Sequence, residues 1–361
     1  MALWLDGLSR QELDEGVLAR LHADHDVTGA VTNPVNLAWS ISTGRYDDDL
    51  QQLAGGDGDV AADEALRRLL VADARAAADL LLPAFRASGG AEGWVTVDAL
   101  LGTEPEPGAG VEAEALGAAA ARLRQRIDRP NVLVALPPSP AGLAAATAAL
   151  AEGRSVNVMP VFSPERYGAA VDAVLAGLHT AAEAGTDAPV TAVLSVAVNQ
   201  VDTDVDKQLW GVGSDASAKL RGQAGLANAR LVRAVHDERA ALDPWRALAD
   251  EGHRPPRLAW VATGVRDPYY APTHYLDGLV HGNGTATAVP EATLSSLPNG
   301  TPSVNGGPVA SVDDARATVA AVEAVGVDFG STVRALDDRG IERYTRAWHD
   351  ARTSVASALG R

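Results

Sequence analysis

The sequence predicts an α/β protein with the architecture of a (β/α)8 barrel, the TIM-barrel fold. Eight short runs of β-branched or other apolar residues recur along the chain, and a longer stretch with helical spacing follows each of them. The chain has 361 residues, of which 47% are hydrophobic, so it can bury the core that such a barrel needs. Because eight strand–helix units close a parallel barrel, we expect a single barrel domain over residues 1–361 with extended βα loops.

The predicted strands are short, and the segments between them are long enough to hold helices. The strands are Ala2–Leu5, Val27–Val31, Trp94–Val97, Val132–Leu136, Val156–Val158, Val193–Val198, Leu258–Val261 and Thr287–Val289. Two helix starts are marked clearly: Ser9 and Glu12 have the spacing of a capping box, and Ser163 is followed by a proline at the first helical position. The longest predicted loops cover residues 54–59, 102–110 and 297–308.

Composition and charge exclude several classes of function. The formal net charge is −17, which repels nucleic-acid phosphates and anionic membranes, so we expect a small-molecule partner and neither nucleic acid nor membrane. The chain has no cysteine, and His22 and His25 have no third ligand in view, so neither a cofactor nor a metal is expected. The sequence has no leader peptide and no apolar run of about 18 residues, so we expect a cytoplasmic protein. A homodimer is compatible with the sequence, which does not fix the oligomeric state.

Polar side chains at the predicted strand ends are the candidate site residues, because chemistry in such barrels takes place at the carboxyl ends of the strands. They are Asp6, Thr32, Asn33, Thr96, Asn157, Ser195, Gln200 and Arg266. Asp6 is the candidate general acid/base, with a carboxylate that simply caps the following helix as its alternative role. Asn33 and Asn157 could instead bind backbone groups at the strand ends, and Arg266 could pair with Asp267.

A set of short motifs follows the predicted strands in a fixed order along nearly the whole chain. The motifs lie at residues 3–9, 32–34, 155–158, 161–167, 201–207, 220–222, 227–230, 262–268 and 290–293. Each motif alone is unspecific, but the ordered set resembles transaldolases, most closely the longer bacterial branch of that family. The resemblance implies a transaldolase-like barrel of the class I aldolase type and an enzyme of sugar metabolism that transfers a dihydroxyacetone unit.

Position 135 departs from the pattern that this resemblance implies. The family uses a lysine at the end of the fourth strand to form a Schiff base with a ketose phosphate, and this sequence has Ala135 there, in the stretch Asn131-Val-Leu-Val-Ala135. A methyl group offers neither the lone pair that attacks a carbonyl nor the charge that accepts electrons. Lys207 and Lys219 are the only lysines in the chain, and neither follows a predicted strand.

Three further positions also have a less polar residue than the family pattern. Thr96 stands where the family has a glutamate, Met159 where it has a threonine, and Gln200 where it has a phosphate-binding arginine. Met159 is expected to fill part of the space that the missing lysine leaves, as well as to line the substrate site. The family roles that remain are those of Asp6 as acid/base and Arg266 as a phosphate ligand.

The preferred hypothesis is a repurposed enzyme of this scaffold, in the setting of a specialised biosynthetic pathway. We expect it to act on a carbonyl or sugar-derived substrate, phosphorylated or not, by non-imine acid/base chemistry. Asp6, Asn33 and Asn157 are the predicted catalytic residues, and the predicted substrate contacts are Thr32, Thr96, Ala135, Met159, Ser195, Gln200 and Arg266. The alternative is a non-catalytic binding or regulatory protein, which predicts a mouth plugged by Met159 and its neighbours. Conventional transaldolase activity is predicted to be absent.

Overall fold

The computed structural model of the chain describes all residues except 56–59, 100–110, 186–189, 280–283, 298–310 and 361. Its eight strands are parallel neighbours in sequence order, and β8 pairs with β1, so that the sheet closes into a barrel. The strands are β1 (Ala2–Leu8), β2 (Val27–Thr32), β3 (Trp94–Asp98), β4 (Val132–Leu136), β5 (Val156–Val161), β6 (Ala192–Ala197), β7 (Arg257–Val261) and β8 (Ala286–Val289). The predicted barrel and all eight predicted strands are confirmed.

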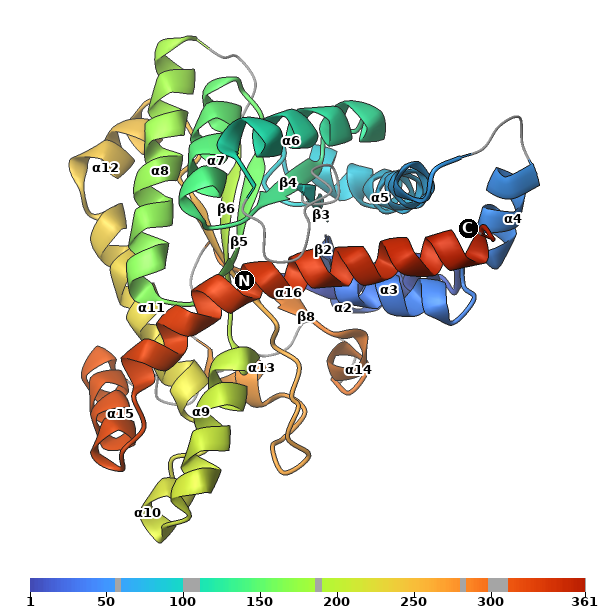
Figure 1. Cartoon of the computed structure of the whole chain (residues 1–361). Helices are drawn as coiled ribbons and strands as arrows, with labels where there is room; N and C mark the ends of the chain where they lie inside the picture. The colour runs from blue at the N-terminus through green and yellow to red at the C-terminus, as the bar shows by residue number, and fades with distance from the viewer. Residues whose placement is uncertain (56–59, 100–110, 186–189, 280–283, 298–310, 361) are drawn as a thin grey trace.

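Helices surround the barrel and extend beyond it (Figure 1). The first half of the chain contains α1 (Arg10–Asp14), α2 (Val17–His25), α3 (Pro34–Ser42), α4 (Asp47–Gly55), α5 (Ala62–Ala87), α6 (Ala113–Ile127), α7 (Pro140–Ala151) and α8 (Pro164–Glu183). The second half contains α9 (Asn199–Val212), α10 (Asp215–Ala218), α11 (Ala224–Ala240), α12 (Asp243–Asp250), α13 (His274–Gly278), α14 (Glu291–Leu294), α15 (Val312–Ala324) and α16 (Phe329–Ala358). No helix in the described part of the chain is both long and apolar enough to cross a membrane.

The two predicted helix starts are confirmed by their hydrogen bonds. Glu12 accepts a hydrogen bond from the backbone N–H of Ser9 at 2.8 Å, which is one half of a capping box. The Ser163 hydroxyl accepts one from the backbone N–H of Arg166 at 3.0 Å, and Pro164 is the first residue of α8. Of the three predicted long loops, residues 102–110 lie wholly outside the described residues and 54–59 and 297–308 mostly so.

Alternating side chains divide the core into two parts, as the pleat of a strand requires. On β4, Val132, Val134 and Leu136 pack outward against the helices, whereas Leu133 and Ala135 pack inside the barrel. The methyl group of Ala135 therefore faces the barrel interior, which is where the side chain of a reactive residue at this position would have to point.

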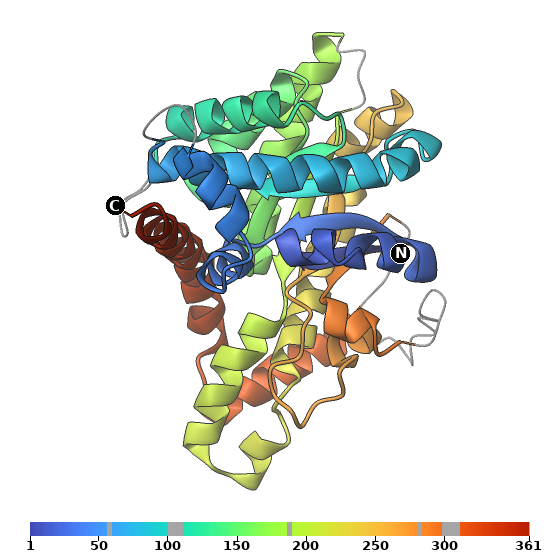
Figure 2. The same ribbon diagram turned by 90° about the vertical axis from the view of Figure 1, so that its right-hand side faces the viewer.

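The last long helix, α16, crosses one end of the barrel (Figures 1 and 2). It packs against α3, α5 and α9, and it also contacts β5. These contacts bring residues from the end of the chain next to residues from its beginning. Because α3 and α9 follow directly after β2 and β6, the helix lies over the carboxyl ends of the strands.

Candidate active site at the barrel mouth

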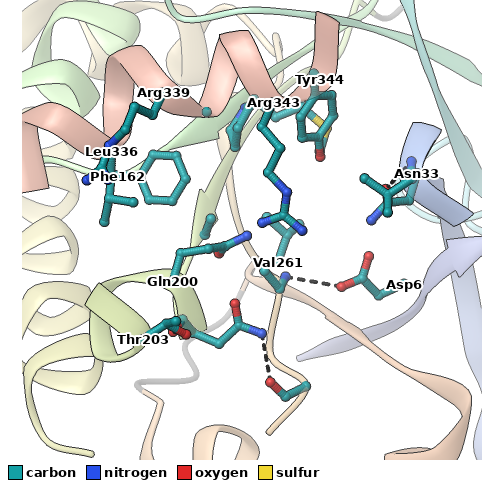
Figure 3. Close-up of a pocket in the computed structure, with 18 of the residues that line it drawn as sticks. Asp6, Asn33, Phe162, Gln200, Thr203, Val261, Leu336, Arg339, Arg343 and Tyr344 are labelled. Atoms are coloured by element: carbon teal, nitrogen blue, oxygen red, sulfur yellow. Dashed lines mark hydrogen bonds between the residues drawn. The ribbon is translucent and has the colours of Figure 1, made fainter. Parts of the chain in front are cut away.

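A cavity of about 350 Å³ lies between the strand ends and α16 (Figure 3). Its volume is in the range of pockets that hold small molecules. Five of the predicted site residues line it, from β1, the start of α3, β5, α9 and the segment after β7: Asp6, Asn33, Met159, Gln200 and Arg266. The structure therefore brings these five residues together around one space.

Asp6 reaches this cavity because β1 is irregular where it ends. Its pairing with β2 shifts register between Asp6 and Leu8, and Gly7, between them, has a φ of +85°, a backbone conformation that favours glycine. A Cβ on Gly7 would also lie 2.2 Å from the side-chain nitrogen of Asn36, which donates a hydrogen bond to the Gly7 carbonyl at 3.0 Å. The sequence Asp6-Gly7 thus combines a carboxylate with the bulge that positions it.

The carboxyl group of Asp6 has an unusual environment. Burial raises its pKa from 3.8 to about 6, although a hydrogen bond at 3.1 Å from the backbone N–H of Ala262 lowers it in part. Figure 3 shows this bond beside Val261, with the other carboxyl oxygen turned toward the cavity. A carboxyl group with a pKa close to neutrality can both accept and release a proton under ordinary conditions, which suits a general acid/base.

Ala262 lines the cavity in a backbone conformation that the sequence does not reveal. It has a φ of +53°, in the left-handed region that alanine rarely occupies, and this conformation costs about 1–2 kcal/mol. Its N–H faces Asp6, while its carbonyl accepts a hydrogen bond at 3.0 Å from the backbone N–H of Asn199. The strained residue therefore links the ends of β1, β6 and β7, and strain of this kind is often found at active sites.

Asn33 has a structural role as well as a place in the cavity. It is the N-cap of α3, and its side-chain oxygen accepts a hydrogen bond at 2.9 Å from the backbone N–H of Val35. This bond to a backbone group is of the kind that the alternative role for Asn33 describes, and it caps α3. Its amide nitrogen has no hydrogen-bond partner among the described residues, so it could donate to a ligand.

Three other predicted site residues form a hydrogen-bond network inside the barrel. The amide nitrogen of Asn157 donates to the hydroxyl of Thr96 at 3.1 Å, and its oxygen accepts from the hydroxyl of Ser195 at 2.8 Å. All three residues are buried, and Asn157 on β5 reaches past β4 to β3. Ala135 lies beside Asn157 on the neighbouring strand, and its small methyl group leaves room for the hydrogen bond between Asn157 and Thr96.

These three residues, together with Thr32 and Ala135, do not belong to the lining of the cavity in the part of the chain that the structure describes. They are buried, and the network satisfies the amide of Asn157 from within the protein. Direct contact between any of these five residues and a ligand stays a prediction. Met159, two residues after Asn157, both lines the cavity and packs in the same buried cluster as Ala135.

No lysine lines the cavity among the described residues. Lys207 lies within α9, and Lys219 follows the last residue of α10; both are exposed. Figure 1 places α10 at the outer end of the chain segment that α9 begins, away from the barrel. The structure thus brings neither amine to the cavity that contains Asp6.

The largest group of residues that sequence reasoning missed comes from α16. Leu336, Arg339, Arg343 and Tyr344 line the cavity from its α16 side, and Figure 3 shows them on the helix that crosses the mouth. Burial, and after it the negative charges of Asp98 and Asp6, raise the pKa of Tyr344, so its hydroxyl stays protonated. The helical pattern was present in the sequence, but nothing in the sequence placed that helix over the mouth.

Comparisons with known proteins agree with this architecture. The family model described as Transaldolase/Fructose-6-phosphate aldolase matches residues 3–355. A protein named Transaldolase from Thermobifida fusca is 40% identical over 363 residues, covering 99% of this chain and 96% of the relative. Transaldolase 1 from Streptomyces avermitilis is 40% identical over 365 residues, with 99% and 93% covered. Transaldolase from Mycolicibacterium smegmatis is 36% identical over 353 residues, with 97% and 92% covered. The chain belongs to the transaldolase and fructose-6-phosphate aldolase family.

Proposed function

We propose that this protein is an enzyme that acts on a carbonyl or sugar-derived substrate by acid/base chemistry without an imine intermediate. The observation that carries the proposal is a cavity of ligand size that contains a carboxyl group with a pKa of about 6 and, in its described lining, no amine. The transfer of a dihydroxyacetone unit through a Schiff base needs such an amine. The names of the relatives support the scaffold and a small-molecule substrate, and the proposal departs from them only in the chemistry.

Asp6 is the group that moves the proton in this proposal. With a pKa of about 6, its carboxylate form can remove a proton next to a carbonyl group, and its protonated form can return one to an oxygen or carbon. The free amide nitrogen of Asn33 is suited to orient a carbonyl or hydroxyl oxygen of the substrate. Asn157 and Ser195 support the inner wall of the site through their mutual hydrogen bond, which makes Asn157 a positioning residue.

The alternative is a binding or regulatory protein that keeps the scaffold and performs no reaction. That alternative predicts a mouth filled by Met159 and its neighbours. The cavity of about 350 Å³, with Met159 in its lining, favours a site that takes a small molecule. The near-neutral pKa of Asp6 favours chemistry over simple binding, because a structural carboxylate gains nothing from being held in a buried place without a cation.

The test is a substrate panel of aldehydes, ketoses and sugar phosphates, followed by mass spectrometry and NMR for any conversion. We expect turnover of at least one compound by the wild type and a fall of about 100- to 10,000-fold for Asp6→Asn. Asp14→Asn is the matched control, because Asp14 is an exposed carboxylate on α1 that does not line the cavity. Turnover that survives unchanged in Asp6→Asn, or a wild type that converts no member of the panel, would reject the proposal.

A further inference from the structure

Tyr344 brings a phenol group to the cavity from the helix that crosses the barrel mouth. The residue is half-buried, and its side chain packs against the inner core cluster, which includes Ala135 and Met159, as well as against the outer one. Figure 3 shows its hydroxyl group pointing from α16 into the cavity, at the end where Asn33 and Asp6 lie. Packing therefore fixes the ring and leaves the polar end of the side chain facing the cavity.

The hydroxyl group of Tyr344 has no hydrogen-bond partner among the described residues. Other tyrosines in the interior do have one: Tyr46 donates to Asp73 at 2.6 Å, and Tyr270 donates to Asp206 at 2.8 Å. Tyrosine hydroxyls that are withdrawn from bulk water normally find such a partner. The missing partner of Tyr344 is expected to be an acceptor atom of the ligand.

The surroundings of Tyr344 keep its hydroxyl protonated. Burial is the main cause that raises its pKa, followed by the negative charges of Asp98 and Asp6, while the charge of Arg343 lowers it in part. Asp98 is buried at the end of β3, two residues after Thr96, so its side chain is directed into the barrel like that of Thr96. A phenol held near two carboxyl groups acts as a hydrogen-bond donor and not as a base.

Acceptor atoms elsewhere in the lining indicate hydroxyl groups on the ligand. Asn199 is 6% exposed; its amide nitrogen donates to the Gly264 carbonyl at 2.7 Å, and its side-chain oxygen has no hydrogen-bond partner among the described residues. The side-chain oxygen of Gln200 is also buried without a described partner, and both residues line the cavity. Because buried acceptors without donors are rare in proteins, hydroxyl groups of the ligand are the expected donors.

Asp6, Asn33 and Tyr344 together contain the groups that the removal of a proton next to a carbonyl group requires. The charge of Asp6 acts on Tyr344, so the two side chains are close. The reaction needs a base at the C–H bond and donors at the carbonyl oxygen, because the negative charge that the base creates moves to that oxygen. Asp6, with a pKa of about 6, is the base, and the free amide N–H of Asn33 and the O–H of Tyr344 are the donors.

We propose that Tyr344 is a catalytic residue, which donates a hydrogen bond to the carbonyl oxygen while Asp6 removes a proton from the neighbouring carbon of an α-hydroxy carbonyl compound. The inference rests on the proposed function and identifies its first step as an enolisation. The reacting carbonyl group then lies between Asp6 on β1 and Tyr344 on α16.

The enolisation needs no further reactant. The Asp6 carboxylate takes the proton, the electron pair of the C–H bond forms a carbon–carbon double bond, and the π pair of the carbonyl group moves to the oxygen. Asp6 then returns the proton to the same carbon or to the former carbonyl carbon. In the second case the proton of the neighbouring hydroxyl group passes to the enolate oxygen, so that an aldose becomes a ketose or a ketose becomes an aldose.

Exchange of hydrogen for deuterium measures the proposed step directly. NMR in D2O follows the C–H signals next to the carbonyl groups of dihydroxyacetone, glyceraldehyde, fructose and fructose 6-phosphate. We expect the wild type to exchange at least one of these compounds, and Tyr344→Phe to lower kcat for exchange about 100- to 1,000-fold. KM should change by less than about threefold, because the donor acts mainly on the charge that develops during the reaction.

Tyr269→Phe is the matched control, because Tyr269 is 88% exposed and does not line the cavity. It should leave the rate of exchange within about twofold of the wild type. Tyr344→Phe should keep the melting temperature of the wild type, since the hydroxyl that it removes has no partner in the described protein, and this separates a catalytic effect from misfolding. Equal exchange in Tyr344→Phe and Tyr269→Phe, or a wild type that exchanges none of the four compounds, would overturn the inference.

Asp6→Asn distinguishes this inference from the proposed function. Exchange that Asp6→Asn abolishes and Tyr344→Phe leaves unchanged would retain the proposed function and reject Tyr344 as a catalytic residue. Exchange that Tyr344→Phe lowers and Asp6→Asn leaves unchanged would retain Tyr344 and reject the proposed function. Turnover of a panel compound without any exchange would overturn the enolisation and leave the proposed function in place.

Discussion

Two residues at the mouth are in energetically unfavourable conditions: Asp6 has a raised pKa, and Ala262 has a left-handed backbone conformation. The half-buried carboxyl group of Asp6 has no ion pair among the described residues, and the alanine that donates to it has a left-handed backbone. Both features lower the stability of the folded protein. The two residues are joined by a hydrogen bond of 3.1 Å from the backbone N–H of Ala262 to the carboxyl group of Asp6. The position of Asp6 at a strand end could be predicted from the sequence. The conformation of Ala262 could not, because it depends on the junction of three strands and not on the local residues.

Asp6→Asn should make the protein more stable at neutral pH while it removes the acid/base group. The pKa of Asp6 is raised from 3.8 to about 6 in the folded state, so the folded protein binds the proton more tightly than the unfolded chain. The stability that Asp6 contributes is therefore complete below about pH 4 and is lost as the pH rises through 6. Asparagine does not titrate, and its oxygen can still accept from Ala262.

Urea unfolding at a series of pH values measures this effect. We expect Asp6→Asn to exceed the wild type by about 1–3 kcal/mol above pH 6 and to lose that advantage below about pH 4. Asp14→Asn should show no such pH-dependent gain. A variant that is less stable than the wild type at pH 7 would mean that the Asp6 carboxylate is stabilised in the fold, contrary to its raised pKa.

At the scale of elements, α16 determines what kind of site the barrel mouth becomes. Its 30 residues cross the strand ends and supply Arg343 and Tyr344 to the cavity. The sequence predicts a helix here but does not predict where it packs. Its contacts with α3 and β5 join segments that are far apart in the chain. The site predicted from strand ends alone was for this reason incomplete on one side.

The close approach of α16 to β5 depends on Gly340. A Cβ at this position would lie 2.8 Å from the ring of Phe162, which is buried, and 3.4 Å from Pro160. Gly340→Val should therefore destabilise the protein by about 1–3 kcal/mol and move the helix away from the mouth. Gly330→Val is the control on the same helix, since a Cβ there meets only the flexible end of Arg334, at 3.2 Å.

Thermal unfolding and turnover of a substrate from the panel check this prediction together for the two glycine variants. Gly340→Val should lower the melting temperature and the rate of turnover, because the cavity wall moves with the helix. Gly330→Val should change neither quantity by more than a small amount. Equal effects of the two substitutions would show that the contact between α16 and β5 does not position the cavity wall.

At the scale of the whole molecule, the barrel could be predicted from the sequence. Parallel strands that are buried on both faces consist of consecutive apolar residues, and such runs are easy to recognise. Residues 132–136 are such a run, and each of its side chains is buried. The inward direction of Ala135 was expected from the family resemblance, because a continuous apolar run does not distinguish the two faces of a strand. What could not be predicted is how polar groups inside the barrel find partners. Asn157 binds Thr96 and Ser195 across β4, and this choice depends on the closed barrel and on the small residue at 135.

The central claim concerns the whole chain, because it depends on the position of every amine. Only two of the 30 Lys and Arg residues are lysines, and neither belongs to the described lining of the cavity that contains Asp6. Lys207 borders a neighbouring pocket beside Thr203 and Arg266. The proposed function rests on the finding that no lysine belongs to the described lining of the cavity, where an amine would have to stand to form an imine with a ketose. Acid/base chemistry from Asp6 is the route that we propose in its place.

Borohydride reduction in the presence of a ketose phosphate tests this claim most directly, with intact-mass spectrometry as the readout and a lysine-bearing transaldolase as the positive control. The account predicts that the mass of this protein stays unchanged while the control gains one reduced sugar adduct. An adduct of the same size on this protein, mapped to Lys207 or Lys219, would contradict it.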